Sequence, residues 1–88
     1  MYAIICTDNE GALEIRKANR EAHLAYAAET PVVLAGPFQN DDGDMIGSLV
    51  VLDVETRADA EAWAANDPYA KAGLFQDVRI ERFKKVIG

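Results

Sequence analysis

The order in which strand-like and helix-like patterns follow one another restricts the fold of this chain more than any other feature. Short apolar runs with β-branched residues are typical of strands, and two alanine-rich stretches have the spacing of helices. The strand-like runs are residues 2–7, 32–38, 45–54 and 77–86, and the helix-like stretches are residues 10–29 and, with an interruption, 56–73. The order strand–helix–strand–strand–helix–strand predicts a ferredoxin-like α+β fold, in which two helices cover one face of a four-stranded antiparallel sheet.

This arrangement uses the whole chain, so we expect a single domain over residues 1–88. Half of the residues are hydrophobic, which is enough for a folded core. The sheet face away from the helices also carries apolar residues, and no part of the chain is left to cover it. We therefore expect a homodimer in which two copies pack their open sheet faces together, making a dimeric α+β barrel.

The first helix is expected to cover residues 10–29 and to end there, because the residue before Pro31 is pushed out of the helical conformation. Its apolar face would consist of side chains at helical spacing, namely Ile15, Ala18, Ala22, Ala25 and Tyr26. The second helix is expected to begin after Thr56, whose hydroxyl can cap it. Asp59, three residues further on, would complete a weak version of the capping box.

The two central strand-like runs are expected to form a hairpin, because Asp42-Gly43 between them is a common turn signal. Pro37 cannot donate a ladder hydrogen bond, so its end of the strand should be frayed or lie at an edge of the sheet. Alternation gives the third strand two faces, one with Ser48, Val50, Leu52 and Val54 and the other with Leu49, Val51 and Asp53. In the last strand, Val78 and Ile80 would share one face and Phe83 would lie on the other.

Charge and composition exclude several classes of partner. The net charge is −6, whereas nucleic acids and anionic membranes are bound by basic surfaces. Cys6 is the only cysteine, so no internal disulfide can form, and its apolar surroundings predict a buried, unreactive thiol. No basic leader segment is visible, and no apolar run approaches the ~20 residues of a membrane span. We expect a cytoplasmic protein that binds neither nucleic acid nor membrane.

The sequence "AANDPYAKAGLF" (residues 64–75) interrupts a good helix and restarts it at once. Asp67 followed by Pro68 is the usual beginning of a helix, where the carboxylate accepts backbone N–H groups. A carboxylate has about four acceptor sites, so capping leaves room for a second partner. The only histidine in the chain, His23, is the candidate for that partner.

His23 is expected beside the apolar face of the first helix, in a stripe with Arg16, Arg20 and Ala27. If Asp67 accepts a hydrogen bond from its Nδ1–H, the pair has the arrangement of a general base, because the carboxylate fixes the tautomer and favours the imidazolium. The alternative is that His23 is a structural or exposed residue and Asp67 only a helix cap.

Other polar and special residues complete a candidate cleft. Ser48 could line it, but "IGSLV" lacks the G-x-S-x-G pattern, which argues against a hydrolase nucleophile. Gly36 and Pro37 could turn the chain or let a ligand approach the backbone, and Tyr69 could belong to the core or the cleft. A single histidine and a single cysteine argue against metal binding as the role of this chain, and there is no phosphate-binding glycine loop. We expect no cofactor.

Four segments resemble the YciI-like (YCII-related) family in order: "REAHLAY" (20–26), "LAGPF" (34–38), "GS" (47–48) and "AWAANDPYAKAGLFQDVRIERFKKV" (62–86). The last is the most specific, and together they span nearly the whole chain. The resemblance implies a dimeric α+β barrel with a His–Asp pair in a small cleft, which maps onto His23 and Asp67, with Ser48 as the cleft serine. Glu21 departs from the proline that many relatives carry before the Ala-His step.

The resemblance also implies the kind of chemistry. One similar branch acts as a dehydrochlorinase on a chlorinated hydroxyquinol, and neighbouring families of the barrel include muconolactone isomerases and cofactor-free monooxygenases. We therefore expect a cofactor-independent acid/base enzyme, with His23 oriented by Asp67, acting by elimination or isomerisation on a small cyclic or aromatic molecule. Arg20 could hold a carboxylate or phenolate of that molecule, or it could be a solvated surface residue. The alternative is a non-catalytic module that binds a small metabolite in the same cleft.

Overall fold

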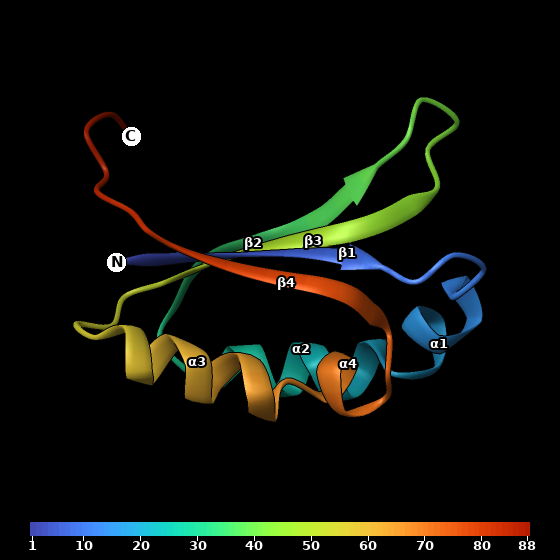
Figure 1. Ribbon diagram of the computed structural model, residues 1–88, viewed down its shortest axis with the longest axis horizontal. Coiled ribbons are helices and arrows are strands. Elements are labelled where there is room, and N and C mark those ends of the chain that lie inside the picture. Colours follow the sequence, from blue (N-terminus) through green and yellow to red (C-terminus); the bar gives the residue numbers. More distant parts are fainter.

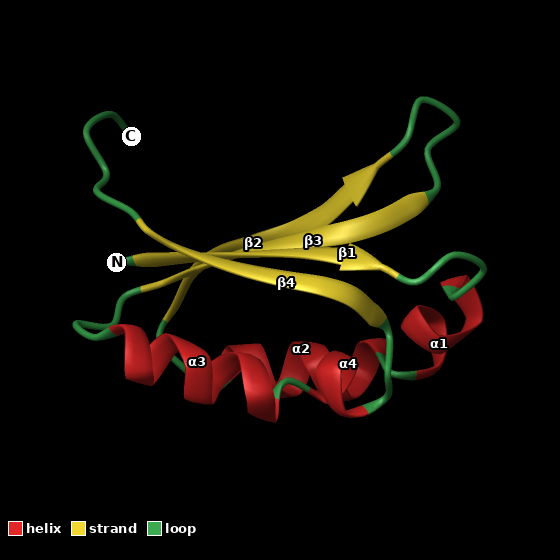
Figure 2. Ribbon diagram, viewed as in Figure 1, coloured by secondary structure: helices red, strands yellow, loops and turns green.

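The computed structural model describes all 88 residues as one α+β unit, with the sheet in one layer and the helices in another (Figures 1 and 2). The order of elements is the predicted one: the second helix is interrupted at Asp67, as expected, whereas the division of the first helix was not expected. In chain order they are β1 (Tyr2–Asp8), α1 (Leu13–Ala18), α2 (Arg20–Ala28), β2 (Val32–Gln39), β3 (Met45–Leu52), α3 (Arg57–Asn66), α4 (Pro68–Lys71) and β4 (Phe75–Arg82).

The sheet is antiparallel throughout, in the order β2-β3-β1-β4, which confirms the ferredoxin-like fold. The predicted hairpin joins β2 to β3, and β2 forms an edge of the sheet, where Pro37 needs no partner for its nitrogen. Ser48 is paired with Cys6 of β1, so both side chains lie on the same face of the sheet. All four helices lie on that face, and none covers the other (Figure 1).

The main core lies between β1, β3 and α3. Its buried residues are Tyr2, Ile4, Cys6, Val50, Leu52, Ala60 and Trp63. Small residues on α3 let this helix lie close to the sheet, so that Ala60 is completely buried and Trp63 is only 6% exposed. Fully burying a side chain such as Leu52 contributes about 1.5–3 kcal/mol. Val50 and Leu52 belong to the core cluster, as predicted for their face of β3, and Val54 packs against it, but the strand itself ends at Leu52, two residues before its predicted end.

The prediction of one helix over residues 10–29 is wrong in two respects. The helix is interrupted at Asn19, whose amide nitrogen donates to the Ile15 carbonyl 2.9 Å away. Asn competes in this way with regular helix hydrogen bonding. The buried side is also different from the alanine face: Ile15, Ala18, Ala22 and Ala25 are all exposed, and only Tyr26 of that set is partly buried.

The side that α1 and α2 turn towards the sheet is a polar stripe. Its polar residues recur at three- and four-residue spacing and are Arg16, Asn19, His23, Tyr26 and, just after α2, Thr30, with Ala27 among them. Arg16 is 3% exposed and His23 is 7% exposed. Burying a charged and a titratable side chain is costly unless each has a partner, so Arg16 and His23 must each find a partner inside the fold.

Two hydrogen bonds fix α2 and the residues just after it against α3. The indole nitrogen of Trp63 donates to the Thr30 hydroxyl at 2.8 Å, and the Tyr26 hydroxyl donates to the Trp63 carbonyl at 3.0 Å. The rings of Tyr26 and Trp63 are also 5.0 Å apart. Because α3 leads directly into Asp67, these contacts set the position of His23 relative to the helix break.

The last strand is displaced from its predicted range of residues 77–86. It begins two residues earlier, at Phe75, and ends at Arg82, which is paired with Tyr2 at the start of β1. Beyond this point only the Phe83 nitrogen still reaches a partner, the Met1 carbonyl at 2.9 Å. The strand therefore ends where its neighbour ends. No helix in the chain has the length and apolar character needed to cross a membrane.

Candidate functional site

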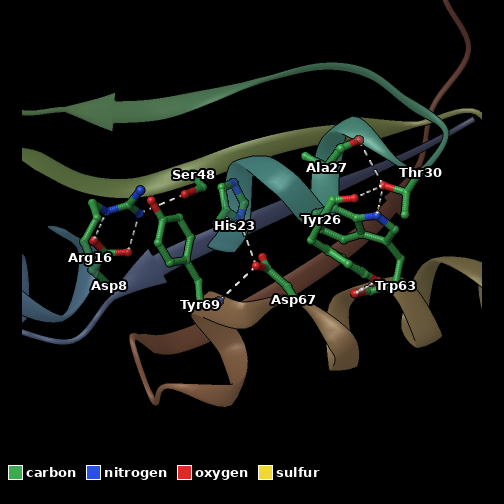
Figure 3. Close-up of polar contacts among 10 residues, drawn as sticks. All are labelled: Asp8, Arg16, His23, Tyr26, Ala27, Thr30, Ser48, Trp63, Asp67 and Tyr69. Carbon is green, nitrogen blue, oxygen red and sulfur yellow. Dashed lines mark hydrogen bonds and ion pairs between the residues drawn. The ribbon is translucent and has the colours of Figure 1, made fainter. Parts of the chain in front are cut away.

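A cleft of about 270 Å³ lies between the polar stripe of α1–α2 and the β2–β3 hairpin, and α4 contributes Tyr69 to its wall. All the residues predicted for the site except Asp67 line this cleft: Arg20, His23, Gly36, Pro37, Ser48 and Tyr69. Asp67 does not line the cleft, and its carboxylate contacts the His23 ring (Figure 3). The fold thus brings together residues that are up to 49 positions apart in the chain, from Arg20 to Tyr69.

Asp67 has both roles that the sequence allows. Its Oδ1 accepts the backbone N–H of Tyr69 at 3.0 Å, which caps α4, with Pro68 at the first helical position. The same oxygen lies 2.8 Å from His23 Nδ1. Asp67 is 2% exposed, and two donors inside the protein hold its carboxylate in place. The interruption between α3 and α4 is what turns this side chain towards His23.

His23 faces inwards. Because it is buried, the alternative hypothesis that His23 is an exposed helix residue is excluded. An ionised Asp67 can only accept, so Nδ1 must carry a proton in this contact. In the neutral imidazole the other nitrogen, Nε2, is then the acceptor. Nε2 has no hydrogen-bond partner in the chain. Every fully buried side-chain nitrogen and oxygen atom does have a partner, so Nε2 must be accessible, and it is open to the cleft that His23 lines. This is the geometry of a general base.

Tyr69 connects the two charged parts of the site. Its ring stacks on the His23 ring, with centroids 4.0 Å apart and an interplanar angle of 13°. The guanidinium carbon of Arg16 lies 4.8 Å from the same ring centroid, so Tyr69 lies between the arginine and the histidine (Figure 3). Burial raises the pKa of the Tyr69 phenol, and the positive charge of Arg16 opposes part of that rise. Tyr69 is therefore both a core and a cleft residue.

Arg16 is the site residue that the sequence did not single out. Its Nε and Nη2 donate to the two carboxylate oxygens of Asp8, each at 2.8 Å, and Nη2 also donates to the Ser48 hydroxyl at 2.8 Å. Burial alone would lower the pKa of Arg16, but the hydrogen bonds and charge of Asp8 raise it above its ordinary value. Two features of the sequence could have pointed to Arg16: Asp8 follows a strand-like run, and Arg16 shares the stripe of His23 on the predicted helix.

The remaining predicted residues have simpler surroundings. Arg20 is exposed at the cleft, whereas Ser48 is 3% exposed and anchored by Arg16. Gly36 has no atom close to where a Cβ would lie, so it is not needed for close packing. Gly47 differs, because a Cβ there would collide with the Cys6 backbone carbonyl. Glycine at position 47 thus allows β3 to approach β1 beside Ser48.

Cys6 is a core residue outside this chemistry. It is 3% exposed, as predicted, and burial raises the pKa of its thiol to about 12. A thiol with such a pKa is protonated at neutral pH and is a poor nucleophile. The histidine, cysteine, aspartate and glutamate side chains form no group of three or more that could hold a metal ion.

Known proteins resemble this chain over nearly its full length. Residues 1–84 match the family model described as a YCII-related domain. An alignment of 96 residues with protein YciI of Escherichia coli is 38% identical and covers 98% of each chain, and one of 95 residues with a Haemophilus influenzae protein is 39% identical and covers 97% of each. A solved structure, the 5-chloro-2-hydroxyhydroquinone dehydrochlorinase TftG of Burkholderia phenoliruptrix in complex with 2,5-dihydroxybenzoquinone, has a TM-score of 0.85 and 35% identity, covering 96% of this chain and 94% of that one.

Proposed function

This chain belongs to the YCII-related (YciI-like) family, and on that basis we propose that it is a cofactor-independent acid/base enzyme acting on a small cyclic or aromatic molecule. The observation that carries the proposal is the contact between His23 Nδ1 and Asp67, which leaves Nε2 as an acceptor in the cleft. The similarity to a dehydrochlorinase of 35% identity supports ring hydroxyl compounds as the substrate class.

The proposed step is proton transfer through His23. Nε2 takes the proton of a ring hydroxyl, and the oxygen keeps the electron pair. Returning the proton to a ring carbon completes an isomerisation. Where that carbon carries chlorine, chloride then leaves with its bonding pair while a second hydroxyl loses its proton, so that the net change is loss of HCl. General acid–base catalysis of this kind contributes about 10²–10⁴-fold.

The other residues that line the cleft support the assignment of a small, oxygen-bearing substrate. Arg20 is an exposed cation at the cleft, suited to a phenolate or carboxylate of the substrate. Gly36 and Pro37 of β2 form the opposite wall, where the backbone approaches the ligand without large side chains. Ser48 adds a hydroxyl to the same cleft.

The test is turnover of 5-chloro-2-hydroxyhydroquinone, followed by chloride release. We expect activity in the unmodified protein and a loss of at least 10²-fold in His23→Asn, whose amide can still donate to Asp67. Glu21→Gln, an exposed neighbour on α2, is the matched control and should keep full activity. Turnover in His23→Asn equal to that of the unmodified protein would reject the proposed role.

A second candidate function is binding of a small metabolite without turnover. It is favoured by the burial of the pair, because the His23 side chain is 9% exposed and that of Asp67 is 3% exposed, and Asp67 is already used as a helix cap. In that case ring hydroxyl compounds bind to the unmodified protein, none is converted, and His23→Asn changes stability and affinity only.

We also propose a homodimer through the open sheet face. Leu34 and Phe38 of β2 are paired with Val51 and Gly47, which puts them on the face without helices, and they are 53% and 41% exposed. Apolar side chains together on a sheet face are typical of an interface. Analytical ultracentrifugation should give a dimer mass, and Phe38→Glu should shift it to the monomer. The cytoplasmic location stays a prediction.

A further inference from the structure

Two contacts join α2 to the end of α3, and they are neighbours. His23 contacts Asp67, and the Tyr26 hydroxyl donates to the Trp63 carbonyl (Figure 3). His23 and Tyr26 are three residues apart along α2, and Trp63 is four residues before Asp67, so each pair shares one side of its helix. A change in the spacing of the two helices at one contact is therefore felt at the other.

The Trp63 carbonyl needs a donor because of the helix break. In an unbroken α-helix this carbonyl would accept the N–H of residue 67, four positions further on. The Asp67 N–H turns instead to the Ala64 carbonyl, 3.4 Å away. The Tyr26 hydroxyl donates to the Trp63 carbonyl in its place, at 3.0 Å. Tyr26 thus closes the end of α3 at the turn of the chain that presents Asp67.

The Thr30 hydroxyl connects the same tryptophan to the end of α2. Its proton points at the carbonyls of Tyr26 and Ala27, which lie 3.0 and 3.1 Å away in the last turn of α2. Its oxygen accepts the Trp63 indole N–H at 2.8 Å. Trp63 is therefore held at two points, by its indole nitrogen and by its own carbonyl, and both points belong to α2 or to the residues just after it.

We propose that Tyr26 and Thr30 are positioning residues for the acid/base pair. Their hydroxyls hold α2 and the end of α3 at the spacing that brings His23 within 2.8 Å of Asp67. None of Tyr26, Thr30 and Trp63 lines the cleft, so they act through the pair and not on the ligand. The proposal rests on the proposed function, because this spacing matters for turnover only if His23 transfers a proton.

A neutral hydroxyl is the suitable donor beside the break. Burial raises the pKa of the Tyr26 phenol, and the negative charge of Asp67 raises it further. The hydroxyl therefore keeps its proton and stays a donor over the pH range in which histidines titrate. A charged donor at position 26, such as lysine, would compete with His23 for the Asp67 carboxylate.

The experiment removes the Tyr26 hydroxyl alone. Tyr26→Phe keeps the ring, whose centroid lies 5.0 Å from that of Trp63, and loses only the donor to the carbonyl. The first measurement is the exchange rate of the His23 Nδ1–H proton with water, by NMR of ¹⁵N-histidine-labelled protein. We expect this rate to rise by about two- to tenfold, which is the effect of losing one neutral hydrogen bond on a local opening.

The second measurement is the kinetics of chloride release from 5-chloro-2-hydroxyhydroquinone. A displacement of about 1 Å in a catalytic group can cost about 10²-fold in rate. Tyr26→Phe leaves the Thr30 contact in place, so we expect kcat to fall by only about tenfold. KM should stay unchanged, because no residue that lines the cleft is altered.

Two controls separate positioning from loss of stability. Tyr2→Phe removes a hydroxyl that has no hydrogen-bond partner in the chain, so it should change neither measurement. Thr56→Ala removes the cap at the other end of α3 and should lower the melting temperature without changing the exchange of the His23 proton.

Thr30 provides an independent pair of variants. Thr30→Val has nearly the same shape but takes away the acceptor of the Trp63 indole N–H, so it should act as Tyr26→Phe does. Thr30→Ser keeps the hydroxyl and should restore both the exchange rate and kcat. A residue that acted only by filling space would give the opposite order, because valine fills the site better than serine.

Unchanged exchange in both Tyr26→Phe and Thr30→Val would overturn the inference, and so would equal acceleration in Thr56→Ala. A His23 proton that exchanges too fast to observe in the unmodified protein would overturn it as well, because the pair would then not be held. If the unmodified protein released no chloride, the proposed function would fail while the exchange rates still tested positioning. If His23→Asn lost turnover but the exchange ignored Tyr26 and Thr30, the acid/base role would stand and positioning would fail.

Discussion

Replacing Asp67 separates the work of a helix cap from that of a histidine partner, because one oxygen does both. In Asp67→Ala the Tyr69 N–H loses its acceptor at 3.0 Å and His23 Nδ1 loses its partner at 2.8 Å. Loss of a cap costs about 1 kcal/mol, and loss of a hydrogen bond to a charged group costs about 1.5–3 kcal/mol. We expect Asp67→Ala to lower the free energy of unfolding by about 3 kcal/mol.

Asp67→Asn is the informative partner variant. Its amide oxygen can still accept from the Tyr69 N–H, and Asn caps helices about as well as Asp. The neutral amide makes a weaker hydrogen bond with His23 than the carboxylate does. The expected loss is therefore about 1–2 kcal/mol, between the unmodified protein and Asp67→Ala.

The matched control is Thr56→Ala, which removes the cap of α3. The Thr56 hydroxyl accepts the Asp59 N–H at 3.1 Å and has no other partner, so about 1 kcal/mol should be lost. Urea unfolding followed by the Trp63 fluorescence measures all three variants. For a domain of this size, 1 kcal/mol corresponds to about 4–8 °C in melting temperature. If Asp67→Ala costs no more than Thr56→Ala, the carboxylate only caps a helix and the reasoning is refuted.

Three further predictions concern stability. Gly47→Ala should cost about 1–3 kcal/mol in urea unfolding, because its Cβ collides with the Cys6 carbonyl, whereas Gly36→Ala, with nothing close, should cost less; equal costs would contradict this. Burial raises the pKa of the Cys6 thiol from 9.0 to about 12, so the folded chain keeps a proton that the unfolded chain releases. The free energy of unfolding should therefore fall above about pH 9, by up to about 1.4 kcal/mol per pH unit, and Cys6→Ala should show a shallower fall. Arg16→Met alone should cost about 3–5 kcal/mol, because it leaves the Asp8 carboxylate buried and unpaired; adding Asp8→Asn should recover part of this loss, and no recovery would argue against the ion pair.

The fold was predictable because its information is local. Strand and helix periodicity, the caps at Thr56 and Asp67, and the turn at Asp42-Gly43 each specify short segments, and their order leaves few topologies. The side of the first helix that is buried was not predictable by the same means. Alanines on its surface resemble an apolar face, yet Ala22 and Ala25 gain little from burial, while Arg16 and His23 have strong partners in the fold.

Some residues of the candidate site could be predicted from the sequence, and others could not. The helix break pointed to Asp67, the single histidine of the chain was its candidate partner, and the resemblance to a family supported the pair. The contact of Arg16 with Asp8 and Ser48 joins the helix to two strands, and no spacing rule in the sequence relates such residues. Asn19 was the local signal of the interruption, because its side chain competes with regular helix hydrogen bonding, but the helical spacing of the residues on either side concealed that signal.

The most direct test of the central claim is the tautomer of His23, read from the ¹⁵N chemical shifts of the imidazole in histidine-labelled protein. The account requires that neutral His23 carries its proton on Nδ1, that Nε2 is unprotonated, and that the ring takes up a second proton reversibly as the pH falls. Asp67→Asn should weaken this tautomer preference. A neutral ring protonated on Nε2, or a ring that never takes up a proton while the protein stays folded, would contradict a general base at this position.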